Sequence, residues 1–285
     1  MNDYLRSAVL GIVEGLTEFL PISSTAHLRL VEAAFHLDLA DPYWKTYTIV
    51  IQLGAILSLP VYFRARIAGF LTAPRGGRPI YAHPLGLVLI AFVTTAIPAF
   101  LLSKVIGKNL ESLTVIGAAL LAGGVVMWVV DAWRAPGEKA GPESPGNPIR
   151  TWKMEEMTVG QAVWIGACQI LSAVFPGTSR SMATIAGGQL ARMSRAAALE
   201  FSFFLSMPTM VAATGYDLLK TLLGRNSGAL RPDLHGWVVL AIGFGVSFVV
   251  AYGSVAALMA WVRRRGFVPF AIYRILLGAA VLFWR

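Results

Sequence analysis

Apolar runs of membrane-spanning length occupy most of this sequence and restrict the folds that are open to it. A transmembrane helix needs roughly 17–25 predominantly apolar residues. Runs of about this length lie at 46–63, 84–102, 114–131, 198–219, 236–262 and 268–284. Hydrophobic residues make up 56% of the chain and charged residues 14%, whereas soluble domains carry roughly 25% charged residues. We therefore predict an all-α polytopic membrane protein.

The net charge of +9 would suggest a nucleic-acid partner in a soluble protein. In a membrane protein, lysine and arginine instead concentrate in the loops and set the orientation of the spans. The sequence lacks basic runs with interleaved aromatic residues, so no nucleic-acid partner is expected. The single cysteine, Cys168, lies in an apolar run. One cysteine excludes a disulfide framework and a metal site built from cysteines.

One apolar segment is too short to span the membrane, a second repeats its pattern, and each ends at a proline. Residues 8–20 run into Pro21, and residues 159–175 run into Pro176. The thirteen residues of 8–20 reach only ~20 Å as a helix at ~1.5 Å each, and proline stops a helix. We predict that each segment turns at membrane depth and returns as a re-entrant helical hairpin, with second halves at 25–37 and 179–192. Irregular backbone at that depth must be buried in protein or line a wet cavity.

The two hairpins resemble one another. When Pro21 is aligned with Pro176, four further positions agree in character: Gly11 with Gly166, Glu14 with Gln169, Thr17 with Ser172, and Ser24 with Ser179. A polar linker at 134–158 separates a first repeat, residues 1–133, from a second, residues 159–285, within one integral membrane domain of residues 1–285. Each repeat would contain one hairpin and three transmembrane helices. Three crossings reverse the side on which the second repeat begins, which predicts an inverted-topology repeat whose interrupted elements meet near the midplane.

Loop cations predict the orientation of the chain. One set of loops carries Arg64, Arg66, Arg75, Arg78, Arg134, Lys139, Arg150, Lys153 and Arg263–Arg265, and the other carries Arg6, Arg29, Lys45, Lys104, Lys108, Lys220, Arg225, Arg231 and Arg285. The first set is slightly larger and is therefore expected on the cytoplasmic side. Both termini and the base of the first hairpin would then face the periplasmic or outer side, and with them the candidate site.

Glu14 and Glu18 are the two carboxylates of the short apolar segment 8–20. They are four residues apart, so a helix places both on one face. An ionised carboxylate at membrane depth costs about 2.5–3.5 kcal/mol on insertion scales, and two on one face also repel each other. The pair is therefore expected to bind a cation or to face a polar cavity. The alternative is that both lie near the membrane surface in water.

Arg180, in the turn of the second hairpin, is the cation expected to face these carboxylates if the two turns meet. Helices that begin at the turns would present free backbone N–H groups and a positive dipole end. Together with the planar guanidinium of Arg180, these groups predict an anion site suited to phosphate. A structural Glu–Arg ion pair is the alternative, but it would not need the surrounding hydroxyl groups. The substrate-binding candidates are Ser23, Thr25, Gln52, Gly177, Thr178, Ser179, Ser181 and Thr184.

Ser24 is the best candidate nucleophile, because Glu18, or a water held by it, could take its proton. The alternative assigns Ser24 to phosphate binding and makes water the nucleophile. His27 lies three residues beyond Ser24 on the same helical face. It could protonate a leaving phosphate or shuttle protons, or it could be a structural residue at the membrane surface.

Two further sets of polar residues are interpreted as structural in the first instance. Gln52, inside an apolar span, is expected to hydrogen-bond a neighbouring helix or the hairpin. Glu200, Arg192 and Arg195 cluster near a helix junction and are expected to form an ion-pair group.

At these residues the chain resembles a known family. Glu14-Gly15-Leu16-Thr17-Glu18 matches an (E/Q)xxxE signature, and a PGxSRSxxT signature matches Pro176-Gly177-Thr178-Ser179-Arg180-Ser181-Met182-Ala183-Thr184. Together they are similar to the bacterial undecaprenyl pyrophosphate phosphatase family of the bacitracin-resistance type. The resemblance covers nearly the whole chain and includes the Ser23-Ser24-Thr25 turn, Gln52-Leu53-Gly54, Glu200-Phe201-Ser202-Phe203 and Pro269-Phe270-Ala271-Ile272-Tyr273-Arg274.

The resemblance implies an enzyme, an undecaprenyl-diphosphatase of the inner membrane. It would hydrolyse undecaprenyl pyrophosphate to the monophosphate and inorganic phosphate, recycling the lipid carrier for peptidoglycan synthesis and conferring bacitracin tolerance when abundant. The implied catalytic residues are Glu14, Glu18, Ser24, His27 and Arg180. A requirement for Mg²⁺ or Ca²⁺ is also implied. In this chain the cation would rest on Glu14, Glu18 and the pyrophosphate, because the sequence shows no dedicated set of oxygen ligands.

Two other classes of protein remain as alternatives. Inverted repeats with polar hairpins at the midplane are also typical of secondary transporters, so a transporter or flippase of an anionic polyprenyl lipid would fit the same pattern. A membrane scaffold is disfavoured by the charges and hydroxyl groups inside apolar segments. The sequence leaves a homodimer open alongside a monomer.

Overall fold

The computed structural model describes residues 2–37, 41–72, 79–102, 112–222 and 233–283. Within these ranges the regular secondary structure is helical, and the one β pairing is an isolated bridge between Thr151 and Met193. The all-α prediction is therefore confirmed. Of the loop cations that predict orientation, those outside the described residues are Arg75, Arg78, Lys104, Lys108, Arg225, Arg231 and Arg285.

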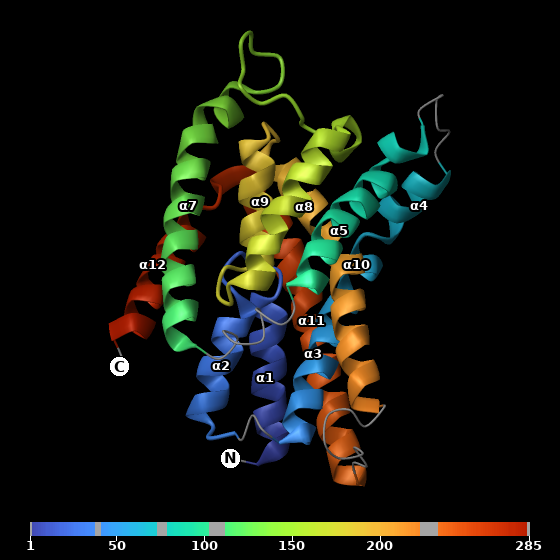
Figure 1. Ribbon diagram of the computed structural model, residues 1–285, viewed down its shortest axis with the longest axis vertical. Coiled ribbons are helices and arrows are strands. Elements are labelled where there is room, and N and C mark those ends of the chain that lie inside the picture. Colours follow the sequence, from blue (N-terminus) through green and yellow to red (C-terminus); the bar gives the residue numbers. More distant parts are fainter. Residues whose placement is uncertain (1, 38–40, 73–78, 103–111, 223–232, 284–285) are drawn as a thin grey trace. The chain divides into compact units, whose positions relative to one another are not determined.

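Apart from α4, which the sequence did not predict, the α-helices follow the predicted order along the chain (Figure 1). They are α1 (Asp3–Thr17), α2 (Ser24–Ala34), α3 (Pro42–Tyr62), α4 (Arg64–Thr72), α5 (Pro84–Leu101), α7 (Leu113–Ala140), α8 (Val159–Val174), α9 (Arg180–Leu190), α10 (Arg195–Leu222), α11 (Leu234–Arg265) and α12 (Val268–Phe283). Short 3₁₀ turns, η1 (Ile80–Ala82) and η2 (Met154–Glu156), precede α5 and α8.

Several of these helices are long and apolar enough to cross a membrane. Among the described residues, four helices meet that test by length and composition, namely α5, α7, α10 and α11. The broken pair Tyr43–Tyr62 and Arg64–Thr72 makes a fifth candidate. The helices α8 and α12 are shorter but apolar. The chain is therefore a polytopic helical membrane protein.

Both predicted hairpins form as helix–turn–helix pairs. In the first, α1 and α2 pack together, and in the second α8 and α9 lie side by side (Figure 1). One predicted boundary is wrong, because α7 continues to Ala140 through Pro136 instead of ending near 131. The polar residues of its last turns are hydrogen-bonded: Arg134 donates to the Leu190 carbonyl at 3.1 Å, and Glu138 accepts from the Arg195 N–H at 2.5 Å.

The chain divides into two compact units. Unit 1 comprises residues 1–19, 24–64 and 206–256, and unit 2 comprises residues 20–23, 65–205 and 257–285. Each unit therefore takes segments from both predicted repeats. The repeat boundaries and the inverted topology themselves stay predictions.

In unit 1, α1 packs closely against α11 through two glycines one helical turn apart. A methyl group added at Gly11 would lie 2.8 Å from the Gly243 carbonyl oxygen, and one at Gly15 would lie 2.7 Å from the Ser247 carbonyl oxygen. Small residues at four-residue spacing allow helix backbones to approach in membranes. A buried cluster of Leu10, Leu28, Tyr47, Ile51, Val239 and Leu240 completes the core of this unit.

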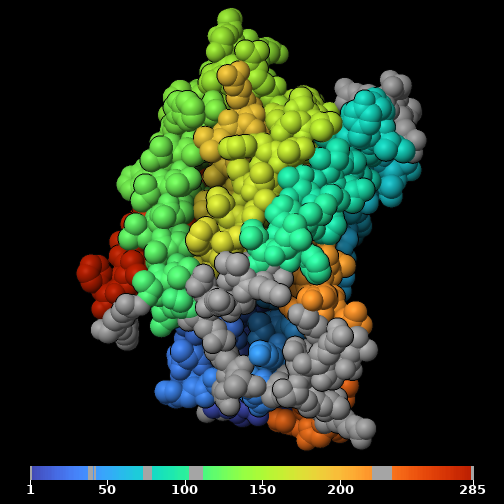
Figure 2. Space-filling view, in the orientation of Figure 1, coloured from blue at the N-terminus to red at the C-terminus, as the bar shows by residue number. Residues whose placement is uncertain are grey.

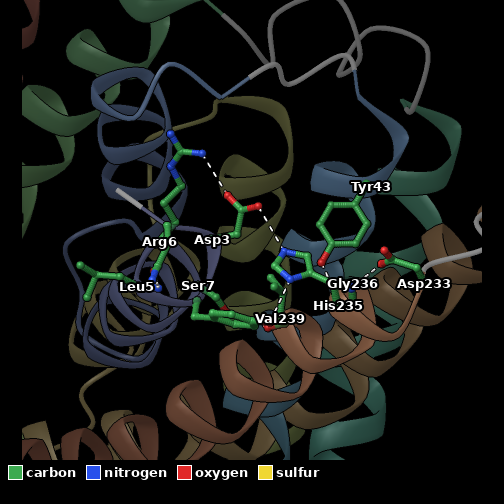
Figure 3. Close-up of polar contacts among 11 residues, drawn as sticks. Asp3, Leu5, Arg6, Ser7, Tyr43, Asp233, His235, Gly236 and Val239 are labelled. Atoms are coloured by element: carbon green, nitrogen blue, oxygen red, sulfur yellow. Dashed lines mark hydrogen bonds and ion pairs between the residues drawn. The ribbon is translucent and has the colours of Figure 1, made fainter.

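Polar contacts near the start of α11 fix this packing (Figure 3). Ser7 is fully buried and donates to the Val239 carbonyl at 2.7 Å, while the Tyr43 hydroxyl donates to the Gly236 carbonyl at 3.0 Å. At the exposed end, Asp3 lies 3.4 Å from the His235 ring. The contacts join α1, α3 and α11 into one body that carries Glu14 and Glu18.

In unit 2, α8 packs against α5 in the same manner. A methyl group added at Gly166 would lie 2.5 Å from the Ala91 carbonyl oxygen, and Thr95 donates to the Gly166 carbonyl at 2.7 Å. Gly11 and Gly166 are aligned positions of the two hairpins, and α11 and α5 hold the same place in the two halves. Each hairpin therefore packs on the corresponding helix of the opposite half, which is the packing that an inverted repeat would produce.

Candidate functional site

The first part of the candidate site lies in unit 1, where α1 ends and α2 begins. Glu14 is fully buried, and Glu18 is 8% exposed at the C-terminal cap of α1. The Glu18 N–H donates to the Glu14 carbonyl at 2.9 Å, so the two residues are on successive turns of one helix. Ser24 is the first residue of α2, and its Oγ donates to Glu18 Oε2 at 2.5 Å. A serine hydroxyl is thus paired with a carboxylate that could accept its proton.

The first turn of α2 supplies the remaining predicted residues of this part. Thr25 is exposed and His27 is half-buried. His27 and Ser24 are three residues apart in a helix and therefore share a face. Gln52 is half-buried in α3. The predicted alternative in which both glutamates are solvated at the membrane surface is wrong, because both carboxylates are buried.

The second part of the candidate site is the turn between α8 and α9 in unit 2. The helix α8 ends before Pro176, and Gly177 follows with a left-handed φ of 92°. Ser179 caps α9 with φ 67°, and its Oγ accepts a hydrogen bond from the Met182 N–H at 3.3 Å. Arg180 is the first residue of α9. Arg180 therefore lies at the positive end of the α9 helix dipole.

Gly177 is the position in this turn where no other residue fits. A methyl group there would lie 2.5 Å from the Ile116 carbonyl oxygen. Gly177→Ala is expected to lower the free energy of unfolding by about 2–6 kcal/mol, since left-handed φ costs a non-glycine residue about 1–3 kcal/mol and overpacking costs typically about 1–3 kcal/mol more. Gly146→Ala is the matched control, because Gly146 has φ 73° but open space around it. Thermal melts in detergent should rank the wild type above Gly146→Ala and Gly146→Ala above Gly177→Ala, and equal losses in the two variants would contradict this account.

Arg274 of α12 joins the two turns within unit 2. Its side chain is fully buried. Nη1 donates to the Pro21 carbonyl at 3.2 Å, and Nη2 donates to the Gly177 and Thr178 carbonyls at 3.1 and 3.0 Å. Nη2 also donates to the Ala119 carbonyl of α7 at 3.1 Å. The Arg274 guanidinium therefore binds both the turn of the first hairpin, residues 20–23, and the turn of the second.

The contacts of Arg274 also orient the peptide groups of the second turn. A trans peptide places its C=O and N–H on opposite sides. Because the Thr178 carbonyl is bound by Arg274, the following Ser179 N–H is directed away from that guanidinium. In the part of the chain that the structure describes, no carboxylate pairs with Arg274. A buried cation without a counter-ion is costly, so its position at both turns indicates a role in their geometry.

If the two turns form a catalytic site, Arg274→Met is expected to lower its kcat by about 10²-fold, because a misplacement of about 1 Å can cost that much. Substrate KM should change less than kcat, since the side chain contacts backbone carbonyls of the turns, which cannot donate to a phosphate. Arg274→Lys, which keeps three N–H donors, should restore part of kcat without restoring all four contacts. Steady-state kinetics on detergent-purified variants measures both constants. A folded Arg274→Met protein with the kcat of the wild type would refute the positioning role.

The other predicted substrate-binding residues differ in the hydrogen bonds and burial of their side chains. Ser23 is buried with φ 76° in the first turn. The hydroxyl of Thr184 lies 2.7 Å from that of Ser202, so it also joins α9 to α10. Ser181 is 1% exposed, and within the described ranges its Oγ has no hydrogen-bond partner. Whether these side chains bind substrate stays a prediction.

The donor set for a metal ion is small. Among the described residues, no group of three or more His, Cys, Asp and Glu side chains could hold a metal ion. Glu14 and Glu18 supply hard carboxylate oxygens, which suit Mg²⁺ or Ca²⁺. The residues therefore fit a cation that takes its other ligands from phosphate oxygens and water, as Mg²⁺ commonly does.

The ion-pair group expected at Glu200, Arg192 and Arg195 has other partners in the structure. Glu200 accepts from Arg66 Nε at 2.6 Å, and Arg66 also binds Glu155 of η2 at 2.5 Å. This guanidinium lowers the pKa of the Glu155 carboxyl. Arg195 instead binds the fully buried Asp131 at 2.7 Å. The residues are structural, as expected, but the predicted grouping is wrong.

Arg274 and Asp131 are the polar residues whose roles sequence reasoning missed. Arg274 is an ionisable residue inside an apolar run, which by itself is a signal of a specific role. Asp131 lies at the end of the predicted span 114–131, where its sequence position does not distinguish it from a loop residue. Its Oδ2 also accepts from the Phe267 N–H at 3.0 Å and so ties α7 to the start of α12.

Comparison with known proteins yields a consistent set of relatives. A family described as "Bacitracin resistance protein BacA" matches residues 7–280. A protein of Koribacter versatilis (strain Ellin345), named undecaprenyl-diphosphatase, is 61% identical over 100% of this chain and 99% of its own length. Proteins of the same name from Novosphingobium aromaticivorans and Caldanaerobacter subterraneus are 41% and 38% identical, over 98% and 96% of their lengths and 100% and 99% of this chain.

Proposed function

Because the chain belongs to the BacA family of bacitracin resistance proteins, we propose that it is an undecaprenyl-diphosphatase. It hydrolyses undecaprenyl pyrophosphate to undecaprenyl phosphate and inorganic phosphate, which returns the lipid carrier to peptidoglycan synthesis. Full-length relatives that carry this name support the reaction. The structural observation that carries it is the 2.5 Å hydrogen bond from Ser24 Oγ to Glu18 Oε2.

We assign the binding of the pyrophosphate to the starts of α2 and α9. Each begins at a turn rich in hydroxyl groups, and free N–H groups at a helix start bind phosphate oxygens. Arg180 adds a positive charge and a planar fork of donors. Ser24 follows directly on Ser23, the last residue of the turn segment that shares Arg274 with the second turn. We propose that Ser24 and Arg180 act on one pyrophosphate.

The proposed chemistry is attack on the terminal phosphorus. Ser24 Oγ, or a water held by Ser24 and Glu18, forms the new P–O bond, and the anhydride P–O bond breaks. Glu18 takes the proton of the nucleophile, and undecaprenyl phosphate leaves with the bond's electron pair. Arg180 and the turn amides stabilise the negative charge on the equatorial oxygens. If Ser24 attacks, water then hydrolyses the phosphoserine and regenerates the hydroxyl.

His27 and Glu14 have supporting roles in this proposal. His27 donates a proton to the leaving phosphate or carries one away, from the face that it shares with Ser24. Glu14, one turn before Glu18, supports the carboxylate and with it forms the donor set for Mg²⁺ or Ca²⁺. When bound, such a cation would neutralise charge on the pyrophosphate oxygens. Among the described residues, Glu14 and Glu18 would supply its protein ligands.

The protein is a multi-pass protein of the bacterial inner membrane, as its apolar helices and family support. We further propose that the site opens to the periplasmic or outer side, because the smaller set of loop cations lies on the side of the first hairpin's base. Accessibility of a cysteine introduced at Asn2 to a membrane-impermeant thiol reagent in whole cells tests this orientation. The homodimer that the sequence leaves open stays a prediction, which the mass of the detergent-solubilised protein tests.

Release of inorganic phosphate from undecaprenyl pyrophosphate by the purified protein tests the proposed reaction. The phosphatase predicts multiple turnovers in detergent and accumulation of the lipid monophosphate. The alternative, a transporter of an anionic polyprenyl lipid, predicts movement of the lipid across proteoliposomes without phosphate release. The second result, from folded protein with Mg²⁺ or Ca²⁺ supplied, would contradict the proposed function.

A further inference from the structure

An apolar groove of about 530 Å³ lies in unit 2 between α7, α8 and α9. Figure 2 shows the face on which α7 (green) and α8 (yellow) lie to either side of α9. The volume of the groove is within the ~300–1,000 Å³ that is usual for ligand pockets. Its lining is almost entirely apolar, with Thr178 and Cys168 as the polar exceptions.

Small side chains create this groove. The helix α7 contributes Ala118 and Ala122, four residues apart, and α9 contributes Ala183 and Ala186. Alanine at these positions leaves a furrow that larger side chains would fill. The groove follows the length of α9, whose 11 residues extend for ~16 Å at ~1.5 Å per residue.

The groove ends at the second turn of the candidate site. Phe175 and Thr178, which flank Pro176 and Gly177, are part of its lining. The Thr178 carbonyl is the one that Arg274 binds at 3.0 Å. Gly123, also in the lining, lies against the same guanidinium, with which an added methyl group would collide. The apolar groove and the turn that begins α9 are therefore continuous.

This continuity fits an amphiphilic ligand with an anionic head and an apolar tail. The start of α9 carries the positive end of its dipole and Arg180, while the face of α9 downstream is apolar. We infer that the groove holds the first isoprene units of the polyprenyl tail, with the phosphates at the start of α9. The inference rests on the proposed phosphatase function. The remainder of the tail extends into the bilayer.

The only cysteine of the chain provides a direct probe, because Cys168 lines the groove and is partly exposed. The rate of its alkylation by N-ethylmaleimide is measured in the purified wild-type protein. Undecaprenyl phosphate, the reaction product, is expected to slow alkylation several-fold. Inorganic pyrophosphate and phosphatidylglycerol at the same concentrations are expected to leave the rate unchanged. Equal protection by phosphatidylglycerol would show a general lipid site and overturn the inference.

A pair of variants tests the same inference through kinetics. Ala122→Phe fills the groove, whereas Val125→Phe places the same side chain on an exposed position of α7 outside the lining. Ala122→Phe is expected to raise KM several-fold for undecaprenyl pyrophosphate and also for farnesyl pyrophosphate, whose isoprene units would occupy the same groove. Val125→Phe should match the wild type with both substrates. Identical constants for Ala122→Phe and Val125→Phe would overturn the inference.

These outcomes separate the groove from the reaction. Phosphate release without protection of Cys168 by undecaprenyl phosphate would remove the tail site and leave the phosphatase intact. Protection of Cys168 without phosphate release by the same preparation would contradict the phosphatase and support the tail site.

Discussion

Arg180→Ala is expected to lower kcat/KM for undecaprenyl pyrophosphate by about 10³-fold. Removal of one donor that stabilises transition-state charge costs about 10²–10³-fold in other enzymes. Arg180 offers a full positive charge and several N–H donors in one plane, so the upper end of that range applies. The loss should be mainly in kcat, because the charge on the equatorial oxygens is redistributed in the transition state.

Two further variants give this experiment its control. Arg180→Lys keeps the charge but not the planar fork, and it should recover only part of the activity. Arg264→Ala removes an exposed arginine from the last turn of α11 and should behave as the wild type. Hydrolysis at the wild-type rate by folded Arg180→Ala protein would end the assignment of Arg180 to the site.

Glu18→Gln is expected to lower kcat by about 10²–10⁴-fold, the usual contribution of a general acid or base. The amide is nearly isosteric, and its carbonyl oxygen can still accept the hydrogen bond from Ser24 Oγ. It cannot take the proton of the nucleophile at neutral pH. KM should therefore change little while kcat falls, and phosphate release from purified variants measures both.

The folded yield of Glu18→Gln should not fall, because the substitution removes a carboxylate that is only 8% exposed and costly to bury. Glu143→Gln, at an exposed position in the loop before η2, is the control and should retain full activity. Ser24→Ala then separates the two nucleophiles. A loss as large as that of Glu18→Gln supports attack by serine, and a smaller loss supports attack by water. Near-normal kcat in Glu18→Gln would remove the proposed base.

The sequence predicts the hairpins well because their signals are local. Proline, segment length and a cluster of hydroxyl residues fix where α1 and α8 end and where α2 and α9 begin. The aligned residues Thr17 and Ser172 even share a role, since each hydroxyl donates to a carbonyl of its own helix at 2.7 Å. The pairing of Ser24 with Glu18 follows from the same local geometry, because both lie at the ends of one short turn.

The parts that the sequence missed depend on contacts between distant segments. Arg274 contacts carbonyls of residues 21, 119, 177 and 178, and backbone carbonyls leave no signature in a sequence. The extension of α7 to Ala140 is stabilised by contacts with Leu190 and Arg195. The sequence does not show these distant contacts, and the polar composition of the segment alone predicts a linker. Each hairpin packs on a helix from the other half of the chain, α1 on α11 at Gly11 and α8 on α5 at Gly166. A glycine in the sequence can indicate a close helix contact, but it does not identify the partner helix.

The central proposal is that Ser24, Glu18 and Arg180 act on one pyrophosphate. The most direct measurement is an experimental structure of the protein with a non-hydrolysable methylene-bridged analogue of undecaprenyl pyrophosphate. The account predicts the terminal phosphorus within attack distance of Ser24 Oγ or of a water bound to Glu18, with the Arg180 guanidinium on its oxygens. A terminal phosphate bound to Arg180 but remote from both Ser24 and Glu18 would contradict it.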